Sequence, residues 1–267
     1  MTHIADMKVT LHDGVKMPVL GLGAYQIEGD VTEAVLTAIR LGYRLIDTAA
    51  MYANEAEGGA AVRTAVEQGI ASREELFVTT KVWKTELGYE RTLAAFERSY
   101  QALGLETVDL YLIHWPGSDA DNLGSWRALI ELQKQGKVRS IGVSNFEPEQ
   151  LAYIIEQTGH KPVVDQVEFN PSRTRMALHQ YCRENGIQLE AWGPLGKGRL
   201  LSEPIFTELG RKYGKTPAQI ILRWHLQHGV VAIPKSSREA RMRENADIFD
   251  FQLTDEEMAR ISALDRS

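Results

Sequence analysis

The chain has a single cysteine, Cys182, among its 267 residues. One cysteine can form no intramolecular disulfide and no thiolate metal cluster. Its neighbours Tyr181 and Arg183 continue a helical pattern, so we interpret it as a half-buried structural thiol. A reactive thiol needs an electropositive setting that lowers its pKa. We also expect no metal, because no spacing of histidines and carboxylates resembles a ligand set.

The sequence also lacks an excess of positive charge and any long apolar run. Its formal net charge is −6 and its pI is about 5.7. Such a balance offers no electrostatic footprint for nucleic acid or an anionic membrane, so we expect neither as a partner. The stretch from Met1 to Gly14 contains no apolar segment of signal-peptide length. We therefore expect a cytoplasmic protein. We also expect a small molecule as its partner and a monomer as its state, although the sequence leaves the oligomeric state open.

What the chain does contain is a series of short apolar runs that alternate with amphipathic stretches. Each run has the length of a strand and is apolar nearly throughout, as expected for parallel strands buried on both faces. The runs are Val19–Gly23, Tyr43–Asp47, Leu76–Lys81, Val108–His114, Val138–Ser144, Val163–Phe169, Ile187–Trp192 and Val230–Pro234. Before them, Lys8–Leu11 and Val15–Met17 flank the dipeptide Asp13-Gly14, which is typical of a hairpin turn.

Helix signals fill the intervals between these runs. Three pairs have the spacing of a capping box: Asp30 with Glu33, Thr216 with Gln219, and Thr254 with Glu257. Glycines that end helical patterns follow at Gly42, Gly69, Gly136 and Gly186. Strict alternation without a linker predicts a (β/α)8 TIM barrel, one domain over residues 1–267, with an N-terminal β-hairpin and extra helices.

The main rival fold is an open, doubly wound parallel sheet. In that fold a dinucleotide site usually follows the first strand as Gly-x-Gly-x-x-Gly. Here the first run continues Gly21-Leu22-Gly23-Ala24-Tyr25-Gln26, so the third glycine is missing. The barrel is therefore the better prediction.

Polar side chains end three consecutive apolar runs, where a barrel of this kind places its active site. The runs end in Asp47, Lys81 and His114, and Tyr52 lies in the loop after Asp47. Each alone has an ordinary structural explanation, such as a helix cap or a solvated lysine. Together they make coupled chemistry, because an ammonium lowers the pKa of a phenol from its usual value of about 10. A carboxylate can hold that ammonium, and a neutral imidazole can hydrogen-bond a carbonyl oxygen, so the group predicts a tuned acid for carbonyl reduction.

These residues lie within motifs that resemble those of the aldo-keto reductase family. Gly42-Tyr43-Arg44-Leu45-Ile46-Asp47-Thr48-Ala49, followed by Tyr52 and Asn54-Glu55, resembles its first signature. Further similar segments are Thr80-Lys81, Leu112–Pro116, Gly142–Phe146 and Ile233–Ser236, with Arg241 and Glu244-Asn245 beyond them. Ala191–Gly196 is most similar to bacterial reductases of the 2,5-diketo-D-gluconic acid reductase type. Gly58 departs from the pattern, where an aliphatic residue is usual, and this affects helix packing alone.

The resemblance implies an NADPH-dependent reductase of aldehydes, ketones or keto-sugars. Tyr52 would donate the proton, Lys81 would lower its pKa and Asp47 would pair with Lys81, while His114 would orient the carbonyl. The expected contacts of the nicotinamide are Ser144, Asn145, Gln166 and the stacking Trp192, with Gly193 and Leu195 in the loop that follows. Glu244 and Asn245 would contact the adenine. The substrate would meet His114 and the aromatic residues Tyr25, Trp83 and Trp115.

A basic cluster after the last strand favours NADPH over NADH. Lys235, Ser236, Arg238 and Arg241 lead into a helix, a position that favours anions. Their charge exceeds what NADH needs and suits the 2′-phosphate of NADPH, which arginine can grip with two hydrogen bonds. A solvated basic helix start is the alternative. Of the remaining aromatic and imidazole groups, we expect Trp126 and Trp224 in the core and His179, His225 and His228 at the surface.

Two other functions remain open. One is a non-catalytic NADPH-binding sensor on the same fold, against which the intact Asp47, Tyr52, Lys81 and His114 argue. The other is an unrelated phosphate-binding barrel enzyme in which Lys81 forms a Schiff base. The identity of the physiological substrate, the favoured direction and the stereochemistry depend on pocket loops, which fold analogy does not supply.

Overall fold

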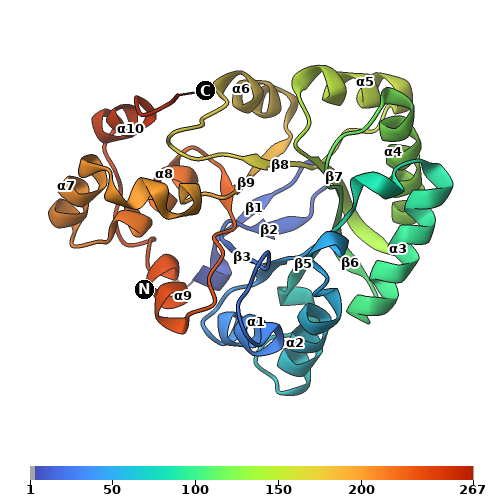
Figure 1. The fold of residues 1–267 in the computed structure, drawn as a ribbon, viewed down its shortest axis with the longest axis horizontal. Coiled ribbons are helices and arrows are strands. Elements are labelled where there is room, and N and C mark those ends of the chain that lie inside the picture. The colour runs from blue at the N-terminus through green and yellow to red at the C-terminus, as the bar shows by residue number, and fades with distance from the viewer. Residues whose placement is uncertain (1–3, 267) are drawn as a thin grey trace.

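In the computed structural model, which describes residues 4–266, eight parallel strands form a barrel with helices around it (Figure 1). The strands are β3 (Gly21–Gly23), β4 (Leu45–Asp47), β5 (Phe77–Val82), β6 (Val108–Ile113), β7 (Val138–Ser144), β8 (Val164–Glu168), β9 (Gln188–Trp192) and β10 (Val231–Ala232). They pair in chain order, and a parallel bridge between Leu20 and Ala232 joins the two ends of the sheet. The predicted (β/α)8 barrel is confirmed. Seven of the predicted runs contain one of its strands, and the run Leu76–Lys81 covers β5 except for its last residue, Val82.

The helices alternate with the strands, with two additions near the C-terminal end. They are α1 (Val31–Arg40), α2 (Glu55–Glu67), α3 (Tyr89–Leu103), α4 (Asp119–Lys134), α5 (Pro148–Thr158), α6 (Met176–Asn185), α7 (Pro204–Tyr213), α8 (Pro217–Gln227), α9 (Glu239–Ala246) and α10 (Asp255–Ser262). Both α7 and α8 lie between β9 and β10, and both α9 and α10 follow β10. These additions are the extra helices that the sequence predicts.

Two of the three predicted capping boxes are present, at Thr216 before α8 and at Thr254 before α10. At α1 only half of the box forms. The side chain of Asp30 accepts from the backbone N–H of Glu33, at 3.0 Å. The carboxylate of Glu33 binds Arg40 instead of reaching back to the cap. The charged partner further along the helix offers a stronger hydrogen bond than the cap N–H.

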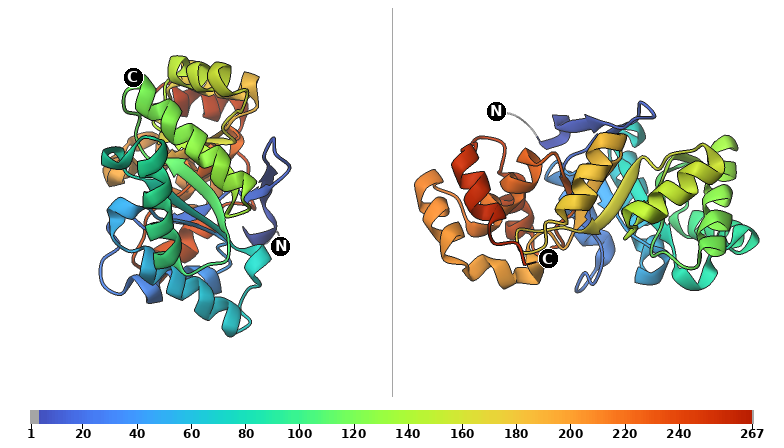
Figure 2. Two further views of the ribbon diagram at one scale, coloured as in Figure 1. Left: turned by 90° about the vertical axis from the view of Figure 1, so that its right-hand side faces the viewer. Right: turned by 90° about the horizontal axis from the view of Figure 1, so that it is seen from above.

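The N-terminal hairpin closes the bottom of the barrel. Its strands β1 (Lys8–Thr10) and β2 (Lys16–Pro18) pair antiparallel, and Figure 2 shows the hairpin across the end of the barrel opposite the C-terminus. Leu11 and Met17 are buried in one cluster with the apolar residues of the barrel interior. Full burial of such a side chain stabilises the fold by about 1.5–3 kcal/mol. The hairpin is therefore an apolar plug.

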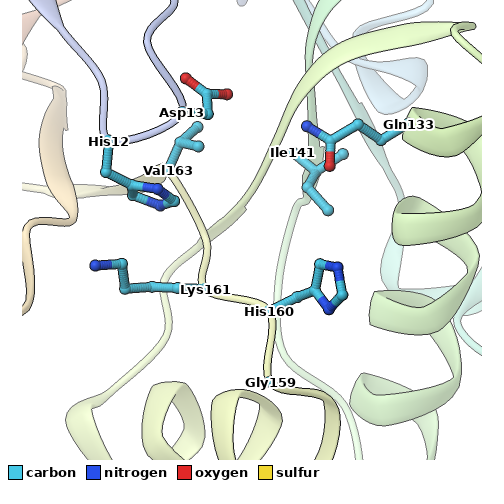
Figure 3. Close-up of a pocket in the computed structure, with 8 residues that line it drawn as sticks. All are labelled: His12, Asp13, Gln133, Ile141, Gly159, His160, Lys161 and Val163. Atoms are coloured by element: carbon cyan, nitrogen blue, oxygen red, sulfur yellow. The ribbon is translucent and has the colours of Figure 1, made fainter.

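A cavity of about 370 Å³ opens beside this plug (Figure 3). His12 and Asp13 of the hairpin turn line it together with Gly159, His160 and Lys161, which precede β8. It thus lies at the N-terminal ends of the strands, away from Asp47, Lys81 and His114. No helix within residues 4–266 combines the length and the apolarity needed to cross a membrane.

The packing around the barrel confirms two of the single-residue predictions and corrects others. Trp126 and Trp224 are fully buried, as predicted. Cys182 is fully buried and not half-buried as predicted, and burial raises the pKa of its thiol. The surface position predicted for His225 is wrong, because its side chain is fully buried on the inner face of α8. Its two ring nitrogens lie 2.8 and 3.0 Å from the carbonyl oxygens of Ile221 and Phe169. Those contacts satisfy the imidazole, which the sequence pattern could not show.

Two further histidines pack beside this buried group. His179 and His228 are half-buried, and their rings lie 5.8 Å apart. The ring of His228 also lies 4.4 Å from that of Trp224. They occupy the edge of an aromatic cluster and are only partly exposed.

Candidate active site

Asp47, Lys81 and Tyr52 meet in hydrogen-bonded contact at the C-terminal rim of the barrel. Lys81 Nζ donates to Asp47 Oδ1 at 2.7 Å, to the carbonyl of Thr48 at 2.9 Å and to the oxygen of Tyr52 at 3.3 Å. These three contacts use all the hydrogens of the ammonium. Since the phenol oxygen accepts here, its own hydrogen stays free for another acceptor.

A second set of hydrogen bonds holds the loop that carries Tyr52. Thr48 donates to Asn54 Oδ1 at 2.6 Å, and Asn54 Nδ2 donates to the carbonyl of Ala24 at 2.9 Å. Between them, Tyr52 ends a short 3-10 turn, and Ala53 has a φ of +55°. Asn54 thus ties the loop after β4 to the loop after β3. In the sequence Asn54 belongs to a motif, but no pattern there indicates this role.

Burial dominates the electrostatics of this group. Burial alone would lower the pKa of Lys81, but Asp47 and Tyr52 outweigh it, so the pKa of Lys81 lies above its usual value. Burial also raises the pKa of Tyr52, and Lys81 lowers it by less, so the net pKa of the phenol lies above 10. The predicted influence of Lys81 is present. The expectation that it brings the pKa of Tyr52 below its usual value is wrong for the protein without cofactor, because desolvation is larger.

His114 completes the group as a neutral imidazole. Its side chain is buried, and burial followed by the charge of Lys81 lowers its pKa to about 3. Its ring meets those of Tyr52 and Trp83 edge-on, with centroids 5.6 and 5.0 Å away. Among the described residues, its Nδ1 has no hydrogen-bond partner. A neutral imidazole here can still donate one N–H to a carbonyl oxygen.

Two of the aromatic residues predicted for the substrate pocket, Tyr25 and Trp83, contact this group. The ring of Tyr25 lies 4.9 Å from that of Tyr52. Tyr25 is 43% exposed and Trp115 is 39% exposed, whereas Trp83 is half-buried. Exposed aromatic surface of this kind, next to buried polar groups, is typical of a pocket that binds a small molecule.

The residues expected to meet the nicotinamide form a network with the same rim. Asn145 Nδ2 donates to the carbonyl of His114 and to Ser144 Oγ, both at 3.0 Å. Trp192 Nε1 donates to Asn145 Oδ1 at 3.0 Å, and Ser144 Oγ donates to the carbonyl of Gln166 at 2.6 Å. Asn145 has a φ of +61°, a left-handed conformation that asparagine tolerates better than most residues. Trp192 is half-buried, so part of the indole is open to a ligand.

Gln166 links this network to Asp47 and to Glu190, a residue that the sequence motifs did not indicate. Its Nε2 donates to Asp47 Oδ2 at 2.7 Å and to Glu190 Oε2 at 2.9 Å. Glu190 is fully buried, and burial together with the charge of Asp47 raises its pKa. The sequence did contain a signal for Glu190. This residue lies two residues before Trp192 on β9, and residues i and i+2 of a strand share a face, so both side chains lie on the same face. An acidic residue inside an apolar run should have marked that face as polar.

The loop after Trp192 contains the other two predicted contacts on this side. Gly193 has a φ of +60°, and a side chain at that position would meet no atom within 4 Å. Leu195 is half-buried against the core. The loop therefore leaves open space next to the indole.

The predicted phosphate-binding residues lie across the rim, after β10. Gly23 N–H donates to the carbonyl of Pro234 at 3.2 Å, which brings this loop beside β3. Ser236 is buried, and its Oγ binds the backbone N–H and carbonyl of Arg238. The side chains of Arg238 and Arg241 are exposed and form no ion pair with any residue in the described part of the chain. Two such guanidinium groups suit a phosphate, which is the fit expected for the 2′-phosphate of NADPH.

The side chains at the remaining predicted positions contact other residues of the protein or are buried. Lys235 Nζ lies 3.9 Å from Glu28 Oε1, a long contact at an exposed site. Glu244 Oε1 accepts from Thr216 Oγ1 at 2.7 Å, and Asn245 is buried. Neither residue points to adenine by its contacts, so their predicted role stays a prediction.

The aldo/keto reductase family model matches residues 19–266. The chain belongs to the aldo/keto reductase family. It is 53% identical over 260 residues to the glyoxal reductase of Bacillus subtilis, covering 97% of this chain and 92% of that protein. It is 42% identical over 262 residues to the methylglyoxal reductase DkgA of Escherichia coli, covering 97% and 93%. The Bombyx mori aldo-keto reductase AKR2E4, solved in complex with NADP, matches with a TM-score of 0.92 and 35% identity, covering 99% and 94%.

This aldo/keto reductase is an NADPH-dependent enzyme that reduces carbonyl compounds, as the sequence predicts. No finding supports the alternative of a non-catalytic sensor. The likeness to reductases of the 2,5-diketo-D-gluconic acid type is also confirmed.

Proposed function

We propose that this enzyme reduces small 2-oxoaldehydes such as methylglyoxal, with Tyr52 as the proton donor. Two similar proteins are named as glyoxal and methylglyoxal reductases. Tyr25 contacts the phenol, Trp83 contacts the imidazole, and the exposed Trp115 follows His114 in the chain. Aromatic residues at these positions favour a compact carbonyl compound. The observation that carries the proposal is the buried contact of Lys81 with both Asp47 and Tyr52.

The polar groups divide the work on the carbonyl oxygen. NADPH, when bound, supplies the hydride that adds to the carbonyl carbon. The neutral His114 donates an N–H to the oxygen and orients it. Tyr52 O–H gives that oxygen its proton, and the ammonium of Lys81 stabilises the phenolate that remains. Asp47 holds the ammonium in place and balances its charge inside the barrel.

Separate residues hold the two ends of the cofactor in this proposal. Ser144, Asn145 and Gln166 present polar atoms to the nicotinamide carboxamide, and Trp192 offers the ring an aromatic face. At the other end, Lys235, Ser236, Arg238 and Arg241 bind the 2′-phosphate, with Glu244 and Asn245 at the adenine. The free guanidinium groups of Arg238 and Arg241 are the support for this assignment.

NADPH oxidation with methylglyoxal, for the wild type and for Tyr52→Phe, tests the proton donor. Loss of the donor lowers kcat by about 10²- to 10⁴-fold, while NADPH binding is retained. Tyr89→Phe is a matched control, because Tyr89 is exposed at the start of α3. Near-normal turnover by Tyr52→Phe would remove the phenol from this role.

The same assay separates the other functions considered. Tight NADPH binding by the wild type without turnover of any carbonyl compound would favour a sensor. Covalent trapping of a carbonyl substrate on Lys81 by borohydride would favour Schiff-base chemistry.

We also propose that the monomer is the active unit. Asp47, Tyr52, Lys81 and His114 come from one chain, as do the proposed cofactor contacts. Light scattering in parallel with activity over a dilution series checks this. A loss of specific activity that follows dissociation of an oligomer would contradict it.

A further inference from the structure

Glu190 is an acidic residue inside the barrel that the proposed mechanism does not use. It lies on β9 between Gln166 of β8 and Val231 of β10, its register partners on either side. Its side chain is fully buried. Oε2 accepts from Gln166 Nε2 at 2.9 Å, and Oε1 has no hydrogen-bond partner among the described residues. A buried carboxyl group with one hydrogen bond is costly, which calls for a functional reason.

The hydrogen bond of Glu190 determines which way the amide of Gln166 faces. The two hydrogens of Gln166 Nε2 go to Asp47 Oδ2 at 2.7 Å and to Glu190 Oε2 at 2.9 Å. The reversed amide would place its oxygen against the Asp47 carboxylate, where neither group could donate. With both hydrogens engaged, the amide oxygen is the group left to meet a ligand, and it can only accept a hydrogen bond.

We propose that Glu190 is a positioning residue for the cofactor, which holds Gln166 so that its amide oxygen accepts an N–H of the nicotinamide carboxamide. The inference rests on the proposed contact between Gln166 and the nicotinamide. Asp47 alone leaves one amide hydrogen unbound and the amide free to rotate about that single contact. Two acceptors on the same nitrogen restrict the amide, so less entropy is lost when the cofactor binds.

The charges around Glu190 are compatible with this task. The titratable groups that face it are Asp47 on β4, Lys81 on β5 and Tyr52 in the loop after β4. Burial and then Asp47 raise the pKa of Glu190, while the Gln166 hydrogen bond and Lys81 lower it by less. In either protonation state an Oε atom can accept from Gln166. Its uncharged form also leaves the Asp47–Lys81 pair balanced.

Cofactor binding tests the inference without depending on turnover. The probes are NADPH and its 3-acetylpyridine analogue, in which a methyl group replaces the carboxamide NH2 and so removes the N–H donor. One hydrogen bond in a buried site corresponds to about a tenfold change in Kd. The wild type should therefore bind NADPH about tenfold more tightly than the analogue, measured by quenching of tryptophan fluorescence.

Glu190→Leu and Glu190→Gln separate positioning from charge. Leucine cannot accept from Gln166, so the preference for NADPH should fall to about twofold or less, mainly through weaker NADPH binding. Glutamine can accept through its amide oxygen, so Glu190→Gln should keep most of the preference. Gln188→Leu is the matched control, because Gln188 lies on the same strand and binds backbone carbonyls at its other end. It should keep the full preference.

Each result supports or overturns the inference. A full preference in Glu190→Leu overturns it, as does an equal loss of affinity for both cofactors, which would mark a structural role only. If Glu190→Leu does not fold, Glu190→Ala applies the same test. A wild type that binds both cofactors equally would overturn the proposed role of Gln166 and this inference with it. Turnover of methylglyoxal by the wild type tests the reductase function separately.

Discussion

Replacement of Lys81 by methionine should cost both stability and catalysis, for different reasons. Lys81 and Asp47 have side chains that are 0% and 2% exposed, and their charged atoms lie 2.7 Å apart. At an effective dielectric constant of about 20 the attraction is about 6 kcal/mol, and desolvation of both groups offsets part of it. Removal of one partner leaves the carboxylate of Asp47 buried with only Gln166 as a donor. We expect Lys81→Met to lose about 3–5 kcal/mol of unfolding free energy.

The double variant Lys81→Met/Asp47→Leu isolates the reason for that loss. With both charges replaced by apolar groups, no uncompensated ion remains in the barrel. One hydrogen bond, from Gln166 to Asp47, stays broken, which costs about 1 kcal/mol. The free energy of unfolding of the double variant should therefore lie within about 2 kcal/mol of the wild-type value. Its turnover should stay about 10²- to 10⁴-fold below the wild type, as for Lys81→Met, because no ammonium assists Tyr52.

Urea unfolding followed by tryptophan fluorescence measures the stabilities, and NADPH oxidation with methylglyoxal measures turnover. A loss of less than about 1 kcal/mol in Lys81→Met would refute the argument from the buried ion pair. So would a double variant as unstable as Lys81→Met. If turnover returned together with stability in the double variant, the ammonium would not be needed for proton transfer.

Three other predictions address cofactor choice and pH. Arg241→Ala should weaken NADPH binding about tenfold and NADH binding less than twofold in fluorescence titrations. Equal losses for both cofactors would show that the guanidinium does not bind the 2′-phosphate. Because the pKa of His114 is about 3 and that of Tyr52 is raised, kcat/KM for reduction should be flat from about pH 5 to 8. A step in that range that disappears in His114→Gln would contradict this. Burial opposes ionisation of Glu257, but hydrogen bonds from Lys212, Tyr213 and the Thr254 backbone lower its pKa to about 2. The pKa of Glu257 is lower in the folded than in the unfolded protein, so the stabilisation is present at pH 7 and is lost as the pH falls towards 2. Glu257→Gln should therefore have a free energy of unfolding about 2 kcal/mol below that of the wild type at pH 7 and an equal one near pH 2. A difference that stays constant with pH would show that ionisation of Glu257 is irrelevant.

The barrel and the rim residues could be predicted because both depend on local patterns. Apolar runs that alternate with capped helices determine the strand order, and strand ends determine which polar groups share a rim. Asp47, Lys81 and His114 each end such a run, so their neighbourhood followed from the topology alone. The hairpin was equally local, since Asp13-Gly14 defines its turn.

Features that depend on three-dimensional contacts could not be predicted in this way. Whether the Glu33 carboxylate binds the helix cap or Arg40 depends on the distance between these side chains in the folded helix. The burial of His225 depends on two carbonyl groups from different segments that satisfy its ring nitrogens. The net pKa of Tyr52 is a balance between desolvation and Lys81, and a sequence supplies the charge but not the depth of burial. For Glu190 the sequence shows a polar position within an apolar run, but its partner Gln166 lies on another strand and is apparent only in the fold.

Closure of the barrel at Leu20 and Ala232 also orders events during synthesis of the chain. The proposed catalytic residues and all the proposed nicotinamide contacts leave the ribosome before Val231, but β3 and β9 keep unpaired edges until β10 arrives between them. Such edges are templates for wrong pairing between chains. The basic cluster follows directly after β10, so NADPH would bind only chains that have closed and would stabilise the closed state by mass action. Cofactor supply would then influence how much of the newly made chain reaches the native barrel.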